Sequence, residues 1–252
     1  MKPVKAWMAW SSGKDSAWAL HAARRQRDIT VVGLLTTVTE AYGRIAMHGV
    51  REELLHAQAA ALGLPLHVAR IPAPCPNEAY EAAMRDALKT ARRHGVTRMV
   101  FGDLFLEDIR AYRERQLARI GMSGVFPLWG RKTPALAREM IHGGLQAYLV
   151  CLDPRKTPRR FAGRPFDASL LADLPDNVDP CGEHGEFHTF AWNGPMFSRP
   201  VDVTIGETVE REGFVFTDLV PSPRRVTCSR DETPTVDRDR RRPLARGRPR
   251  AD

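Results

Sequence analysis

Over the first 150 residues, apolar runs rich in β-branched side chains alternate with segments that have helical spacing. The run 29–37 is the clearest strand, and the helical segment 51–62 stops at Gly63 and Pro65, which are typical helix-ending residues. This alternation predicts an α/β fold, in which a doubly wound parallel sheet has helices on both faces. We expect strands at 4–10, 29–37, 66–71, 97–102, 124–127 and 146–152, and helices at 16–26, 51–62, 77–94 (with Asn77 as N-cap), 108–120 and 134–142.

The pattern changes after residue 152. A basic loop at 155–165 leads to a short helical segment at 167–174, and three alternating segments then follow at 187–192, 201–210 and 214–219. Alternation of this kind is typical of antiparallel strands. We therefore expect a first domain at 1–152 and a smaller C-terminal α+β lobe at 153–220 that packs against it.

The last residues, 221–252, form a basic tail with ten Arg against five Asp plus Glu. The whole chain has a net charge of +8, so most of the excess lies in this tail. It has hardly any large apolar residues and cannot bury enough surface to order itself, so we expect it to be disordered. A weak contact with nucleic acid or with an acidic partner remains the alternative interpretation.

Several features predict a cytoplasmic protein. The longest apolar runs, such as 31–35, contain about five residues, against the roughly 20 that a membrane-spanning helix needs. The apolar segment 6–10 is too short for the core of a signal peptide. The four cysteines, Cys75, Cys151, Cys181 and Cys228, are too few and too far apart for a disulfide framework.

Residues 11–16, with the sequence Ser-Ser-Gly-Lys-Asp-Ser, lie directly between the first expected strand and the first helix. Free backbone N–H groups and the positive end of the helix dipole meet at such a place, which therefore suits phosphate. Gly13 allows close approach of the backbone, Lys14 adds a positive charge, and Asp15 could meet a phosphate-bound Mg²⁺. We predict that phosphate is bound by Ser11, Ser12, Gly13, Lys14, Asp15 and Ser16, of which Lys14 and Asp15 are also catalytic candidates.

This loop is not a Walker A motif. That motif needs Gly where this chain has Met8, and it needs Ser or Thr where this chain has Asp15. A serine-rich helix cap without function is the plain alternative, but the strand before the loop and the helix after it favour phosphate binding.

Residues 11–16 resemble the SGGxDS PP-loop of the ATP pyrophosphatases, with Ser12 at the usual second glycine. The segments 47–51, 101–113 and 181–189, the last reading Cys-Gly-Glu-His-Gly-Glu-Phe-His-Thr, resemble the diphthine–ammonia ligases and their bacterial relatives. The resemblance covers residues 4–220. It implies a Rossmann-like domain of the HUP type that cleaves ATP to AMP and pyrophosphate. It also implies adenylation of a carboxylate or carbonyl, which ammonia or another nucleophile then attacks, but it does not fix the substrate.

Further candidates follow the second strand, because ligands bind at the carboxyl ends of parallel strands. In this fold the end of the strand 29–37, which carries Thr36 and Thr37, and the loop that runs on to Arg51 would flank the adenosine. His48 could donate to a phosphate or carboxylate, and Arg51 could bind either one bidentately. We therefore expect all four residues to contact the nucleotide.

Gly102 and Asp103 follow the fourth strand, opposite the phosphate loop. A carboxylate there suits contact with Mg²⁺ or with the ribose. Asp103 is therefore a catalytic candidate, Gly102 a nucleotide-binding one, and Asp15 with Asp103 the expected magnesium ligands.

The segment 181–189 places three polar side chains between glycines. Glu183 or Glu186 could bind the incoming ammonium or act as a base, and His188 could move a proton. A simple turn between the lobes is the alternative. Cys181, His184 and His188 supply at most three zinc ligands, so we do not expect a zinc site.

These observations predict an AMP-forming, ATP-dependent ligase that makes an amide, with ATP and Mg²⁺ as its cofactors. The acceptor is an unknown carboxylate or carbonyl compound, which could be carried on a protein, and neither a membrane nor nucleic acid is an expected partner. Two alternatives stay open. One is a PP-loop tRNA sulfur transferase, and the other is a sensor module that binds an adenine nucleotide without catalysis.

Overall fold

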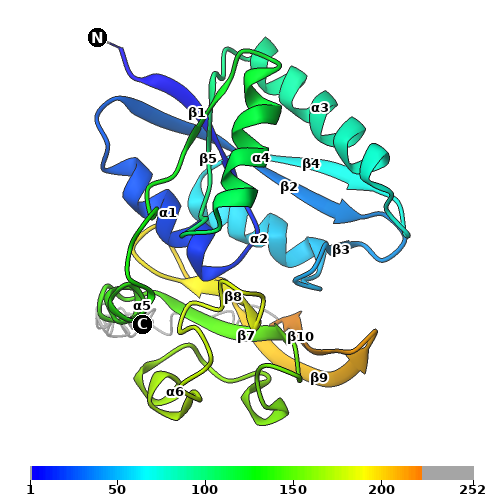
Figure 1. The fold of residues 1–252 in the computed structure, drawn as a ribbon, viewed down its shortest axis with the longest axis vertical. Helices are drawn as coiled ribbons and strands as arrows, with labels where there is room; N and C mark the ends of the chain where they lie inside the picture. The colour runs from blue at the N-terminus through cyan, green and yellow to red at the C-terminus, as the bar shows by residue number, and fades with distance from the viewer. Residues whose placement is uncertain (1, 223–252) are drawn as a thin grey trace, which may run out of the picture.

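The computed structural model describes residues 2–222. Figure 1 shows two sheets, one of six strands with helices on both sides and one of four strands beneath it. The first sheet contains β1 (Val4–Ala9), β2 (Ile29–Thr39), β3 (Arg44–Ile45), β4 (Leu66–Ile71), β5 (Arg98–Val100) and β6 (Ser123–Val125).

The central strand of the first sheet is β1, which pairs in parallel with β2 on one side and with β5 on the other. β4 extends the sheet beyond β2 and β6 extends it beyond β5, both in parallel, while the short β3 pairs antiparallel with the end of β2. The strand order therefore reverses between β1 and β5. In doubly wound sheets this switch point, at the carboxyl ends of the strands, is where ligands bind.

Helices cover both faces of this sheet, as the alternation predicts. Side chains of β1 alternate between the faces, because successive residues of a strand point in opposite directions. Met8 packs in the same buried cluster as Leu20 of α1 (Lys14–Arg24) and Leu55 of α2 (Glu52–Leu62). Trp7 packs on the other face with Leu88 of α3 (Asn77–Arg93) and Leu117 of α4 (Glu107–Ala118).

The second sheet is antiparallel throughout, with the order β8-β7-β10-β9. Its elements are β7 (Gln146–Leu152), β8 (Phe187–Asn193), β9 (Val203–Arg211) and β10 (Phe214–Pro221), accompanied by α5 (Thr133–His142), the 3₁₀ turn η1 (Arg159–Phe161) and α6 (Ala168–Asp173). One buried cluster contains Leu20 and Leu55 of the first lobe together with Leu149 and Phe190 of the second. The lobes therefore share a core, and the predicted domain boundary at residue 152 remains a prediction.

Two local predictions are wrong. The expectation that strand 146–152 joins the parallel sheet fails, since β7 pairs with β8 and β10. Its apolar run identified a strand, but hydrophobicity does not say which sheet will accept it. Asn77 is the first residue of α3 rather than its N-cap, which is Pro76 in extended conformation.

Two further sequence predictions concern membrane-spanning helices and the C-terminal tail. No helix within the described part of the chain is long and apolar enough to cross a membrane. The predicted disordered tail lies outside the described residues except for Pro221, which ends β10, and Ser222.

Candidate active site

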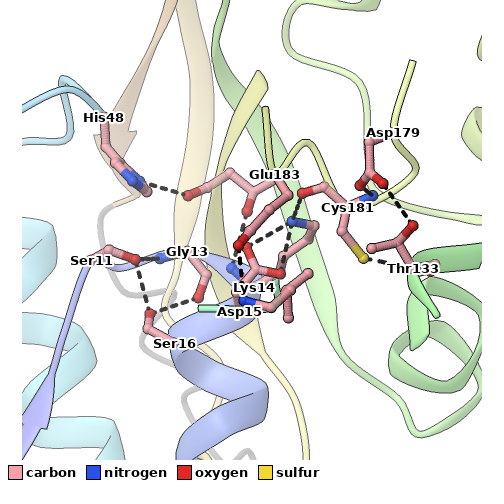
Figure 2. Close-up of polar contacts among 12 residues, drawn as sticks. Ser11, Gly13, Lys14, Asp15, Ser16, His48, Thr133, Asp179, Cys181 and Glu183 are labelled. Carbon is pink, nitrogen blue, oxygen red and sulfur yellow. Dashed lines mark hydrogen bonds and ion pairs between the residues drawn. The ribbon is translucent and has the colours of Figure 1, made fainter. Parts of the chain in front are cut away.

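The phosphate loop leaves β1 and enters α1 through a tight turn. Ser12 has φ 67°, a left-handed conformation that glycine adopts more easily, and this explains physically why a glycine is usual at this place in the loop. Gly13 is the N-cap of α1, so the free N–H groups of the first helical turn lie next to it. The hydroxyls of Ser11 and Ser16 bond within the loop, with the Ser11 Oγ 3.1 Å from the Ser16 Oγ and the Ser16 Oγ 2.9 Å from the Gly13 carbonyl oxygen (Figure 2).

The end of β5 lies directly against this loop. A Cβ on Gly102 would lie 2.8 Å from the Asp15 carbonyl carbon and 2.9 Å from the Ser16 nitrogen, so only glycine fits without a shift of the backbone. The next residue, Asp103, pairs with Arg113 of α4 at 2.9 Å. The sequence prediction that Gly102 and Asp103 lie opposite the phosphate loop is therefore consistent with the packing, while their roles stay predictions.

Strand β8 of the second lobe covers the loop from the other side. The Lys14 backbone N–H donates to the Thr189 Oγ1 at 3.0 Å, and the Ala191 N–H donates to the Ser12 carbonyl at 2.8 Å. Gln58 is fully buried and its amide donates to the carbonyl oxygens of both Ser12 and Ala191. Sequence reasoning missed Gln58 and Thr189, because only the folded chain brings them to the loop.

The ammonium group of Lys14 points into the second lobe rather than into open space (Figure 2). The side chain is 2% exposed, and its Nζ donates to the Asp15 carboxylate at 2.8 Å and to the Cys181 carbonyl. The rings of Phe166 and Phe187 lie 5.6 and 5.4 Å from it. Burial lowers the pKa of Lys14, but Asp15, Cys181 and Glu183 together outweigh it and raise the pKa above its usual value, so the lysine stays charged. The structure thus joins Lys14, which the sequence suggests for phosphate, to the segment 181–189.

Glu183 lies between the two halves of the site. Its Oε1 accepts a hydrogen bond from the Leu104 N–H at 2.8 Å, immediately after Asp103. Burial raises the pKa of this carboxyl to about 7, although the hydrogen bond from Leu104 opposes the shift and the Asp15 charge adds to it. A carboxyl group with a pKa near neutral can exchange protons at physiological pH, as a general base must.

Glu186 lies in a different environment. It is 3% exposed, and its Oε1 accepts a hydrogen bond from the Asp179 N–H at 3.2 Å. The Asp179 carboxylate in turn accepts from the Thr133 hydroxyl at 2.6 Å and from the Cys181 N–H at 2.7 Å. Glu186 therefore supports the turn that carries Cys181. Sequence reasoning did not find Asp179, and no local motif marks it.

His48 and His188 lie over the phosphate loop. Their ring centroids are 4.6 Å apart, and the His48 Nδ1 is 3.3 Å from the Thr189 carbonyl oxygen. The His48 ring also approaches Gly13, since a Cβ there would lie 3.2 Å from the His48 Cε1. Burial lowers the pKa of both rings, that of His188 to about 4 with a contribution from the Lys14 charge. Both rings are therefore neutral at pH 7.

Three other nucleotide-binding candidates are placed less directly. The Thr36 hydroxyl is buried and donates to the Trp10 carbonyl at 2.5 Å, which fixes the end of β1, and Thr37 is half-buried beside it on β2. The Arg51 guanidinium binds the Asp218 carboxylate on β10, with the closest pair of atoms 2.6 Å apart. Arg51 thus joins the loop after β2 to the second lobe, and the structure does not bring it to the phosphate loop.

The two expected magnesium ligands do not form a preformed metal site. Asp15 is paired with Lys14, and Asp103 is paired with Arg113. Within residues 2–222, no group of three His, Cys, Asp or Glu side chains is arranged to hold a metal ion. The residues present therefore do not fit a resident magnesium in this arrangement. Magnesium binding stays a prediction, and no step proposed for this chain depends on it.

Known families match both lobes of the chain. Residues 4–124 match the family model of the diphthamide synthase N-terminal domain, and residues 132–219 match that of the diphthamide synthase C-terminal domain. The chain is 27% identical over 176 residues to the diphthine–ammonia ligase of Rattus norvegicus, a match that covers 64% of this chain and 66% of the relative. It is 31% identical over 121 residues to the enzyme of that name from Bos taurus, covering 44% of each. The match to a third, from Schizosaccharomyces pombe, covers 17% of the relative at 28% identity. The chain thus spans less than two thirds of the length of these relatives.

Proposed function

The chain belongs to the diphthamide synthase family, and we propose that it is an ATP-dependent ligase that forms an amide from a carboxylate or carbonyl compound and ammonia. The matched relatives are named for joining diphthine and ammonia, which supports this class of reaction. We further propose that ATP is cleaved to AMP and pyrophosphate. Diphthine on a protein is the first acceptor to test.

The phosphate loop would hold the triphosphate. The N–H groups of the first turn of α1, other than that of Lys14, which is bonded to Thr189, would donate to phosphate oxygens. The positive end of the helix dipole would attract the same oxygens. The Ser12 Oγ is buried and, among the described residues, has no hydrogen-bond partner, so a phosphate oxygen that reached it would satisfy it. The neutral rings of His48 and His188 would cover the phosphates without adding charge.

The single observation that carries the proposal is the position of Glu183 beside the phosphate loop together with its raised pKa. An oxygen of the acceptor attacks the α-phosphorus of ATP, the bond to the bridging oxygen breaks, and pyrophosphate leaves. The nitrogen of ammonia then attacks the acyl carbon, the carbon–oxygen bond to AMP breaks, and Glu183 accepts a proton from the nitrogen. Its pKa of about 7 and its place between the phosphate loop and Leu104 suit that step.

The main test is product analysis with the full chain. The protein is incubated with Mg-ATP, ¹⁵N-ammonium and a diphthine-bearing acceptor, and small carboxylates are tried in parallel. We expect AMP, pyrophosphate and an acceptor whose mass shows the ¹⁵N amide. Formation of ADP and phosphate instead would contradict the proposal.

Two further outcomes would favour the alternatives. Tight ATP binding without turnover on any acceptor would favour a sensor module. A missing thiolated base in the tRNA of a deletion strain would favour sulfur transfer to tRNA.

A further inference from the structure

A cavity of about 240 Å³ lies between α3 and α4, on the face of the first sheet opposite to α1 and α2. Its floor is apolar and made of buried side chains, with Met99 from β5, Phe101 directly after β5, Leu88 from α3 and Leu117 from α4. Ligand sites in proteins are typically concave, mostly apolar and bordered by a few polar groups. The cavity has this form, and the proposed ligase reaction does not use it.

The rim of the cavity carries an excess of positive charge. Arg85, Arg113 and Arg119 line it, against the single carboxylate of Glu81. The Glu81 Oε1 is already engaged, with the Tyr112 hydroxyl at 3.4 Å and the Gln116 amide at 3.3 Å as donors. Three guanidinium groups against one hydrogen-bonded carboxylate leave the rim with a net positive charge, which favours a ligand with an anionic group.

Arg113 is the cation best placed to anchor such a group. Its guanidinium lies over the Phe101 ring of the cavity floor, with the Cζ atom 4.6 Å from the ring centre. Its Nε is 2.9 Å from the Asp103 Oδ2, yet within residues 2–222 neither of these two buried atoms makes a well-aligned hydrogen bond. The Arg113 Nη2 donates to the Asp103 Oδ1 at 3.2 Å, so the pair has one hydrogen bond while its second contact, from Nε to Oδ2, is poorly aligned. An incoming carboxylate could offer Arg113 the aligned, bidentate geometry that it lacks.

We propose that this cavity is a second ligand site, which takes a small molecule with one aromatic ring and one carboxylate bound to Arg113. The volume of about 240 Å³ is below the roughly 300 Å³ at which drug-sized pockets begin, so the ligand is no larger than a single ring with a short acidic chain. The aromatic and thioether side chains of the floor, such as Phe101 and Met99, suit a planar apolar ring.

The same arginine connects the cavity to the nucleotide site. A carboxylate that binds Arg113 competes with Asp103, which follows directly after Gly102 where that glycine packs on the phosphate loop. Occupancy of the cavity therefore changes the charge around Asp103 and with it the affinity for ATP. Because binding free energies are linked, ATP must change the affinity of the cavity ligand by the same factor.

Titration of the full chain with phenylacetate, followed by calorimetry and NMR, tests the site directly. Phenylacetamide is the control, because it has the same shape without the charge. We expect phenylacetate to bind with a Kd of about 1 mM or lower and phenylacetamide to bind about tenfold more weakly. Equal affinities, or no saturable binding of phenylacetate, would overturn the proposal.

Three variants locate the binding. Arg113→Gln should weaken phenylacetate about tenfold. Met84→Trp should block it by filling the cavity that Met84 lines, with the fold checked by circular dichroism. The control Arg115→Gln changes an exposed arginine of the same helix outside the cavity and should bind phenylacetate as the parent does. Unchanged binding by Arg113→Gln would overturn the anchoring role of Arg113, and an ATP affinity that ignores saturating phenylacetate would overturn the link to Asp103.

Discussion

The phosphate loop and the segment 181–189 face each other across the candidate site, but the chain builds them in different ways. The loop takes its shape from consecutive residues between β1 and α1, and the hydroxyls of Ser11 and Ser16 bond inside it. The segment meets the loop through contacts between distant residues. Glu183 reaches Leu104 across 79 positions, and the Thr189 hydroxyl reaches the Lys14 N–H across 175. The proposed phosphate site is thus encoded locally, whereas the proposed proton transfer depends on how the two lobes pack.

Replacement of Lys14 should have the largest effect, because Lys14 joins the two regions. Lys14→Met removes the cation from a buried ion pair and leaves the Asp15 carboxylate and the Cys181 carbonyl without their donor. We expect the free energy of unfolding to fall by about 3 kcal/mol, as measured by urea denaturation.

Lys156→Met is the matched control for that change. Lys156 also donates to the segment 181–189, at the His184 carbonyl, but it is exposed, so its loss should cost within about 0.5 kcal/mol. If Lys14→Met instead keeps its stability and loses ATP affinity, then Lys14 serves the phosphates, as the sequence alone suggested.

Glu183→Gln should slow catalysis without weakening ATP binding, and should thus separate the roles of the two regions. The variant keeps an oxygen that can accept the Leu104 N–H but cannot take a proton, so AMP formation should fall about 100-fold while ATP affinity stays near that of the parent. Below pH 7 the Glu183 carboxyl is protonated and inactive as a base, because its pKa is raised to about 7. At a fixed concentration of unprotonated ammonia, the rate of the parent should therefore rise between about pH 6 and pH 8, and that of the variant should be flat over this range.

Glu186→Gln is the control for Glu183. Its amide oxygen can still accept the Asp179 N–H, so activity should stay within about twofold of the parent. The opposite result, a large loss for Glu186→Gln and none for Glu183→Gln, would assign the proton transfer to Glu186.

The sequence predicts much of the fold because its signals are local. Hydrophobic periodicity and Gly63, a left-handed C-cap, place α2 and most other elements within a few residues. The same signals cannot assign β7 to a sheet, because pairing depends on residues that are distant along the chain. They also miss β3, which is only two residues long.

Prediction of the site residues likewise succeeds where the signal is local and fails where it depends on distant residues. The spacing of strand and helix marks residues 11–16 and Gly102 as neighbours at a strand-end site. It cannot show that Lys14 turns away toward Cys181, nor that Glu183 and Glu186 lie in different surroundings. Both facts depend on the packing of β8 over the loop, and no pattern within 181–189 distinguishes the two glutamates.

Gly102→Ala tests whether the end of β5 supports the shape of the phosphate loop. The added Cβ would lie 2.8 Å from the Asp15 carbonyl carbon, and a backbone atom cannot swing away as a flexible side chain can. We expect the loop to shift and ATP affinity to fall about tenfold, equal to about 1.4 kcal/mol, with overpacking as the cause. Calorimetry measures the affinity and circular dichroism checks the fold. Normal affinity in a folded variant would mean that the end of β5 does not support the loop.

Arg51→Gln should have the smallest effect, and it tests whether the second lobe or the nucleotide uses this arginine. Arg51 binds the Asp218 carboxylate, which Arg44 also binds at 2.8 Å, so Asp218 keeps a partner in the variant. Because this ion pair is partly exposed, we expect a loss of stability of about 0.5 kcal/mol or less and no change in ATP affinity. Arg44→Gln is the matched control, since it removes the other arginine from the same carboxylate and is not a candidate ligand of ATP. If Arg51→Gln weakens ATP binding about tenfold while Arg44→Gln does not, then Arg51 leaves Asp218 to bind the phosphates when ATP enters. In that case Arg51 binds Asp218 only in the free protein, and the loop after β2 carries it from the second lobe to the phosphates when ATP binds.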